Sequence, residues 1–60
     1  MEIKGKTAIV TGSAGGIGRA SAVMLASRGA AEIALVDVNE AGLAGTAQLV
    51  EAEGARASIH

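Results

Sequence analysis

The chain has 60 residues, enough for at most one small domain, and a domain of this size buries only about 60% of its unfolded surface. Half of its residues are apolar but none is aromatic, so its core must be built from Ala, Val, Ile, Leu and Met, which bury less area. With no Cys and one His, neither disulfides nor a metal site is expected to stabilise it, and we predict a piece of a larger domain.

The formal net charge is −1, and the five basic residues are scattered among six acidic ones. No basic face exists to bind a nucleic-acid backbone, so we expect no nucleic-acid partner. No apolar run reaches the roughly 18 residues of a membrane span. We therefore expect a soluble, cytoplasmic chain without a membrane partner.

The first half of the chain predicts a strand followed by a helix. A β-branched, mostly apolar run over Lys6–Thr11 suits a strand that is buried on both faces, as in a parallel sheet. From Gly16 the apolar residues recur at helical spacing, and Gly29 is a typical stop after a helix. These patterns predict a strand over 6–11 and a helix over 16–28.

The second half repeats this order. Glu32–Asp37 has the pattern of a second strand. Asn39 is positioned to cap a second helix, in which Leu43, Ala47 and Val50 form a stripe that is expected to face the sheet. Two glycines, at 42 and 45, weaken this helix by up to about 1 kcal/mol each relative to Ala.

The segment from Ala55 to His60 alternates like the start of a third strand, and the sequence stops there. The element order is β-α-β-α-β, which packs as parallel strands joined by right-handed crossovers. The predicted fold class is therefore α/β. We expect the N-terminal part of a doubly wound parallel-sheet (Rossmann) fold, truncated in the third strand.

A glycine-rich turn leads from the first strand into the first helix. Such a turn offers backbone N–H groups and the positive end of a helix to a phosphate. Gly12 allows a sharp turn out of the strand, Gly16 leaves space where a pyrophosphate would lie, and Gly18 lets the helix pack closely. The turn therefore predicts phosphate binding, although an ordinary strand-to-helix connection is the alternative.

Asp37 supports a dinucleotide in particular. It follows Gly18 by 19 positions, close to the roughly 20 expected for a carboxylate that binds the adenosine ribose. It would repel the 2′-phosphate of NADP, and no cation stands next to Gly16 or Asp37, where Gly15 and Val38 lie. NAD is thus favoured over NADP, and residues 1–60 are predicted to be a partial dinucleotide-binding domain whose remainder is absent.

Simpler roles compete with these assignments. Asp37 could cap the second helix, although Asn39 is available for that role, and Ser13 is either a phosphate contact or an ordinary turn residue. Arg19 is interpreted as a solvated residue of the first helical turn rather than a phosphate ligand, and His60 is given no role. The predicted cofactor-binding residues are Gly12, Ser13, Gly15, Gly16, Ile17, Gly18, Asp37 and Val38; no catalytic or metal-binding residue is predicted.

The segment from Gly5 to Ala20 resembles the amino-terminal segment of the classical short-chain dehydrogenase/reductase family, and the resemblance extends over essentially the whole chain. The family pattern Thr-Gly-x-x-x-Gly-x-Gly falls on Thr11, Gly12, Gly16 and Gly18. The extended branch, with Thr-Gly-x-x-Gly-x-x-Gly, also fits through Gly15. The opening Gly5-Lys6 and the start of the helix favour the classical branch, but the motif alone does not decide.

The resemblance implies an NAD-dependent oxidoreductase that transfers hydride between a nicotinamide and an alcohol or carbonyl substrate, in a homo-oligomeric full-length protein. The family's catalytic Tyr and Lys are not carried over, because this chain contains no Tyr. A non-catalytic dinucleotide sensor or scaffold is the alternative, and a downstream Tyr-x-x-x-Lys would separate the two. A P-loop nucleotide hydrolase is disfavoured, since no Lys followed by Ser or Thr comes after the glycines.

Overall fold

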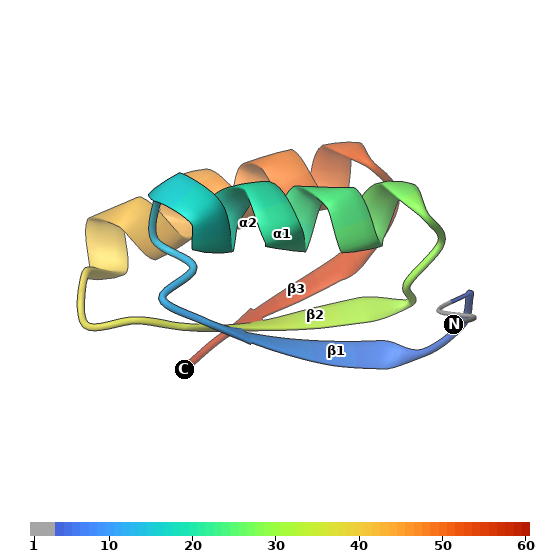
Figure 1. Cartoon of the computed structure of the whole chain (residues 1–60), viewed down its shortest axis with the longest axis horizontal. Coiled ribbons are helices and arrows are strands. Elements are labelled where there is room, and N and C mark those ends of the chain that lie inside the picture. Colours follow the sequence, from blue (N-terminus) through green and yellow to red (C-terminus); the bar gives the residue numbers. More distant parts are fainter. Residues whose placement is uncertain (1–3) are drawn as a thin grey trace.

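The computed structural model describes residues 4–60 and contains three strands and two helices (Figure 1). The predicted β-α-β-α-β order is confirmed, with parallel strands paired in the order β1-β2-β3. The elements are β1 (Thr7–Thr11), α1 (Gly16–Ser27), β2 (Glu32–Val36), α2 (Glu40–Ala52) and β3 (Arg56–Ile59). Each predicted boundary lies within one residue of the observed one.

Both helices lie on the same face of the sheet (Figure 1). Right-handed crossovers that advance along the sheet in one direction place successive helices on one side. Helix α1 contacts β1 and β2, α2 contacts β2 and β3, and the two helices contact each other. Because the strands are parallel, the ends of β1 and β2 meet the starts of α1 and α2 at one edge of the layer.

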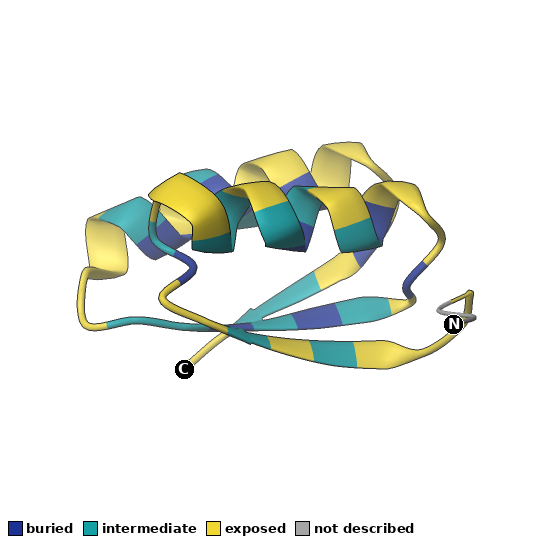
Figure 2. Cartoon of the chain, in the orientation of Figure 1, coloured by how far each residue is buried: buried dark blue, intermediate teal, exposed yellow. Residues whose placement is uncertain are grey.

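The core lies between the sheet and the helices (Figure 2). Ile33 and Leu35 of β2 are fully buried at its centre, and Leu43 and Val50 of α2 pack over them. The predicted sheet-facing stripe of α2 is therefore confirmed, with Ala47 partly buried beside it.

Helix α1 turns its smallest side chains toward the sheet. Ala22 and Ala26 are buried, whereas the larger Ile17 and Met24 are exposed. Alanine lets the helix backbone approach the sheet closely, so the contact is determined by side-chain size as well as by apolar periodicity.

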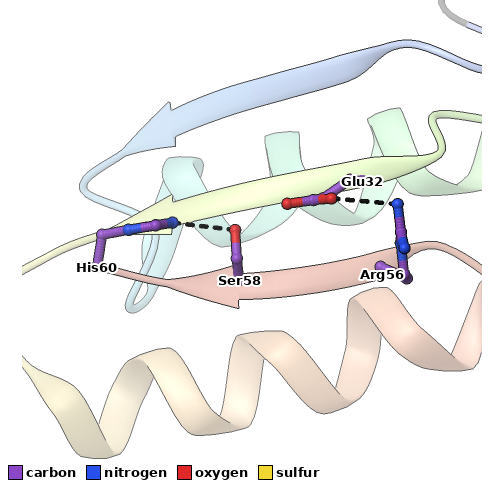
Figure 3. Close-up of polar contacts among 4 residues, drawn as sticks. All are labelled: Glu32, Arg56, Ser58 and His60. Atoms are coloured by element: carbon purple, nitrogen blue, oxygen red, sulfur yellow. Dashed lines mark hydrogen bonds and ion pairs between the residues drawn. The ribbon is translucent and has the colours of Figure 1, made fainter.

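The opposite face of the sheet is not covered by any helix of residues 4–60. Arg56 and Ser58 of β3, and His60 directly after it, have their side chains on this face (Figure 3), whereas Ala57 between the first two packs against the core. Arg56 Nη2 lies 3.4 Å from Glu32 Oε1, and His60 Nε2 lies 3.0 Å from Ser58 Oγ. The ion pair is solvated and contributes at most about 1 kcal/mol.

The helix ends follow the predicted local signals. Asn39 Oδ1 accepts a hydrogen bond from Gly42 N at 3.0 Å, so the predicted cap of α2 is confirmed. After α1, Gly29 has φ 97° and lets the chain reverse toward β2. Neither α1 nor α2, the two helices within residues 4–60, is long and apolar enough to cross a membrane.

Candidate functional site

The glycine turn connects the end of β1 with the start of α1, and three of its glycines have structural reasons to be glycine. Gly12 and Gly16 have φ values of 65° and 58°, in the left-handed region that side chains disfavour. Gly18 has an ordinary φ, but a Cβ there would overlap the Gly12 carbonyl oxygen and lie 2.6 Å from its carbon. The start of α1 is therefore packed directly on the backbone of the turn.

Gly15 differs from these three. Its φ of −175° is extended backbone that any residue adopts, and a Cβ there would meet nothing within 4 Å. The positions that need glycine are thus 12, 16 and 18, which is the spacing Thr-Gly-x-x-x-Gly-x-Gly. The extended spacing would need glycine at position 15, and the backbone does not require glycine there.

The N-terminus of α1 is open. Its N-cap is Gly15, which makes no side-chain cap, and the first helical turn holds no acidic residue. The first backbone N–H groups of a helix have no partner within the helix, so those of Gly16, Ile17 and Gly18 are available to an acceptor from outside. A Cβ at Gly16 would also meet nothing within 4 Å, and an anion therefore has both donors and space here.

Asp37 immediately follows β2 and connects its carboxylate to the glycine turn. Oδ2 accepts a hydrogen bond from Ala14 N at 3.1 Å, and Oδ1 accepts one from Asn39 N at 3.1 Å. These bonds, above all the one from Ala14, lower the pKa of Asp37 below its ordinary value. The side chain is only half-buried, so an ionised carboxylate stays accessible beside the turn.

Ser13 is fully buried. Its N–H donates to Val36 O at 3.3 Å and its carbonyl accepts from Thr46 Oγ1 at 2.6 Å. The hydroxyl Oγ has no hydrogen-bond partner among residues 4–60. The predicted contact between this hydroxyl and a phosphate remains a prediction, and the side chain is not on the surface where an incoming ligand would first meet the protein.

Ile17 and Val38, the two apolar residues among the predicted site residues, are both on the surface. Their side chains are 87% and 99% exposed. Ile17 lies in the first turn of α1, and Val38 lies between Asp37 and the cap of α2. Both apolar side chains are thus exposed beside a carboxylate and an open helix end. They are available to the apolar surface of a bound molecule.

The interpretation of Arg19 as a solvated residue is wrong. Its guanidinium Nε donates to Thr46 Oγ1 at 2.8 Å, and Nη2 donates to the carbonyls of Ala14 at 2.8 Å and Gly42 at 2.9 Å. The reason is tertiary, because α2 packs across the beginning of α1 and brings these acceptors to the guanidinium. We call Arg19 and Thr46, which join α1, α2 and the turn, the polar clamp.

The two glycines of α2 make this approach possible. A Cβ at Gly42 would lie 2.7 Å from both Ala14 Cβ and Ala14 O, and a Cβ at Gly45 would lie 3.0 Å from Arg19 Nη2. These two glycines lower the helix propensity of α2, but they also allow α2 to pack against the turn.

Sequence reasoning missed Thr46 as a site residue. The sequence spacing could have indicated it, because Thr46 lies three residues after Leu43 and four before Val50, on the buried stripe of α2. A polar residue on a buried helix face needs a hydrogen-bond partner, and here the partners are Ser13 O and Arg19. No group of three His, Asp or Glu side chains that could hold a metal is found within residues 4–60.

Comparisons with known proteins agree with this fold. Residues 6–60 match a family described as short chain dehydrogenase. The SadH protein of Mycobacterium tuberculosis, which is named as an oxidoreductase, is 47% identical over 53 residues, which are 88% of this chain and 19% of that protein.

Solved structures give the same result. An NAD+-bound xylitol dehydrogenase is 37% identical, with a TM-score of 0.91, over 100% of this chain and 23% of the other. A short chain dehydrogenase from Mycobacterium paratuberculosis bound to NAD is 33% identical, with a TM-score of 0.90, over 100% of this chain and 27% of the other. The chain spans about a fifth of the length of the curated relatives it matches.

Proposed function

Because this chain belongs to the short chain dehydrogenase family, we propose that it is the cofactor-binding part of an NAD-dependent oxidoreductase. The full-length gene product would transfer hydride between the nicotinamide and an alcohol or carbonyl substrate. The observation that carries the proposal is the position of the Asp37 carboxylate, hydrogen-bonded to Ala14 N in the glycine turn and next to the open start of α1. The NAD-bound structures of similar proteins support the class of cofactor.

The pyrophosphate is assigned to the glycine turn. Free N–H groups at the start of α1 and the space beside Gly16 fit a doubly charged group, and the helix dipole favours it. Gly12 and Gly18 shape the turn around that group, and Gly15, whose surroundings are open, is assigned to contact with it. Ile17 and Val38 are assigned to the apolar surface of the dinucleotide, since both are exposed beside the polar part of the site.

The choice of NAD over NADP is assigned to Asp37. Its carboxylate retains lone pairs for the ribose hydroxyls and would repel a 2′-phosphate. Arg19 is the nearest candidate to neutralise such a phosphate, but Nε and Nη2 of its guanidinium already bind Thr46, Ala14 and Gly42. The charge balance of the site therefore favours NAD.

Calorimetric titration of the full-length gene product with NADH and NADPH tests the proposal. We expect wild type to bind NADH more tightly, and Asp37→Ala to narrow that preference by about tenfold, the effect of roughly 1.4 kcal/mol. Glu51→Ala is the control, because it removes an exposed carboxylate on α2 far along the chain from the turn. Equal affinities of wild type for NADH and NADPH would refute the assignment to NAD.

A further inference from the structure

We infer that Arg19 and Thr46, the polar clamp, are positioning residues that orient the Ala14 peptide units and, through them, the Asp37 carboxylate. The inference rests on the proposed function, since the group it positions is the acid assigned to cofactor choice. It adds two residues of α1 and α2 that need not touch the cofactor.

Thr46 acts on the first of two successive peptide units. Its hydroxyl donates to the Ser13 carbonyl at 2.6 Å inside the protein. In a planar trans peptide the N–H points away from the C=O, so fixing Ser13 O also fixes the direction of Ala14 N–H. That N–H is the donor to Asp37 Oδ2 at 3.1 Å. A continuous chain of hydrogen bonds therefore runs from α2 through the turn to the end of β2.

Arg19 acts on the second peptide unit. Its Nη2 donates to the Ala14 carbonyl at 2.8 Å, and the N–H opposite that carbonyl belongs to Gly15, the N-cap of α1. The carbonyls of Ser13 and Ala14 therefore both accept hydrogen bonds from the polar clamp. The N–H groups of the same two peptide units point to the opposite side, where that of Ala14 binds Asp37.

The geometry of the clamp depends on a guanidinium. Arg19 Nε binds Thr46 Oγ1 while Nη2 binds the carbonyls of Ala14 and Gly42, so one rigid planar group holds three acceptors on two elements. A lysine ammonium is a single point on a flexible stem and does not reproduce this fork. The acceptor Thr46 Oγ1 is held in turn, because its hydroxyl donates to Ser13 O at 2.6 Å, which is closer than its other acceptor, Gly42 O, at 3.2 Å.

The polar clamp controls the direction of the Ala14 N–H group, which general packing of the helices would not do. Without it, Ala14 N–H is free to turn away from Asp37, and the carboxylate loses the hydrogen bond that contributes most to its low pKa. The carboxylate would then sample other positions, which weakens ribose binding in particular. The preference for NADH over NADPH, and the pKa of Asp37, should therefore both respond to changes at Arg19 and Thr46.

The test uses Arg19→Met and Thr46→Val in the full-length gene product, titrated with NADH and with NADPH. Each variant should reduce the preference for NADH by about fivefold, the effect of one hydrogen bond, and Arg19→Lys should fall between Arg19→Met and wild type. The acid limb of NADH binding should also move to higher pH in both variants, as the pKa of Asp37 returns toward its ordinary value. Controls are Arg28→Met and Thr7→Val, at exposed positions outside the clamp, and both should keep the wild-type preference.

Two results overturn the inference, and they are distinguishable. If wild type shows no preference for NADH, the proposed function fails and the inference fails with it. If wild type prefers NADH but the clamp variants lose only thermal stability, with an unchanged preference and pH profile, the clamp is merely structural and the proposed function stands. Should Arg19→Met not fold, Thr46→Val carries the test, because it removes the hydroxyl that binds both Arg19 Nε and Ser13 O; an unchanged preference in a folded Thr46→Val likewise rejects the inference.

Discussion

Gly18 packs against the carbonyl group of Gly12, so that the first turn of α1 rests on the backbone of the loop that precedes it. A methyl group at position 18 has no flexible neighbour to displace, because its nearest contacts are backbone atoms of Gly12 and Ser13. This contact fixes the position of the first turn of α1 relative to the loop. It also separates Gly18 from Gly15, whose surroundings are open.

Gly18→Ala should therefore lower the free energy of unfolding by about 3 kcal/mol or more, the upper range for overpacking. Gly15→Ala is the matched control and should change it by less than about 0.5 kcal/mol, as an open surface position does. Urea unfolding of the full-length gene product measures both values. Equal effects of the two substitutions would contradict the close contact at Gly18.

Gly42→Ala tests whether the approach of α2 outweighs helix propensity. Propensity alone predicts a gain of up to about 1 kcal/mol, but the new Cβ would lie 2.7 Å from Ala14 Cβ and O. We expect a net loss of about 1–3 kcal/mol, measured by urea unfolding. Ala44→Gly, at an exposed position of the same helix, reports the propensity term separately; a stabilised Gly42→Ala would show that α2 can shift without cost.

The acid stability of the fold should depend on Asp37. Its folded pKa lies below the ordinary value of 3.8, so the ionised carboxylate stabilises the fold above that pH. This contribution is lost as the pH falls through the folded pKa. The difference in unfolding free energy between wild type and Asp37→Asn should therefore shrink below about pH 4, in unfolding curves recorded from pH 7 to pH 2.5. Glu51→Gln serves as the control, and a difference that is constant with pH would argue against the two backbone hydrogen bonds.

Ser13→Ala addresses the buried hydroxyl without a partner. Removing an unsatisfied buried polar group relieves its desolvation cost, so the variant should be more stable than wild type by about 1 kcal/mol. The melting temperature of the full-length gene product is the measurement. A destabilised variant would mean that the hydroxyl has a partner beyond residues 4–60, and weaker NADH binding by a folded Ser13→Ala would support the predicted phosphate contact.

Local signals in the sequence were sufficient for the order and ends of the elements and for the cap at Asn39. They also placed the glycines of the turn and located Asp37 at the end of β2. Each of these depends on a few neighbouring residues: a left-handed φ favours glycine, and a short polar side chain caps a helix.

Tertiary structure alone decided what Arg19, Thr46 and Ser13 do. Arg19 and Thr46 lie 27 positions apart, and Thr46 and Ser13 lie 33 apart, so no local pattern reports their contacts. The bonds form only because Gly42 and Gly45 allow α2 to pack against the turn. The sequence by itself determined the element order, the glycine turn and the place of Asp37 after β2. The packing of α2 decided how the turn and Asp37 are held, because a hydrogen bond between distant residues exists only after the elements that carry them have packed.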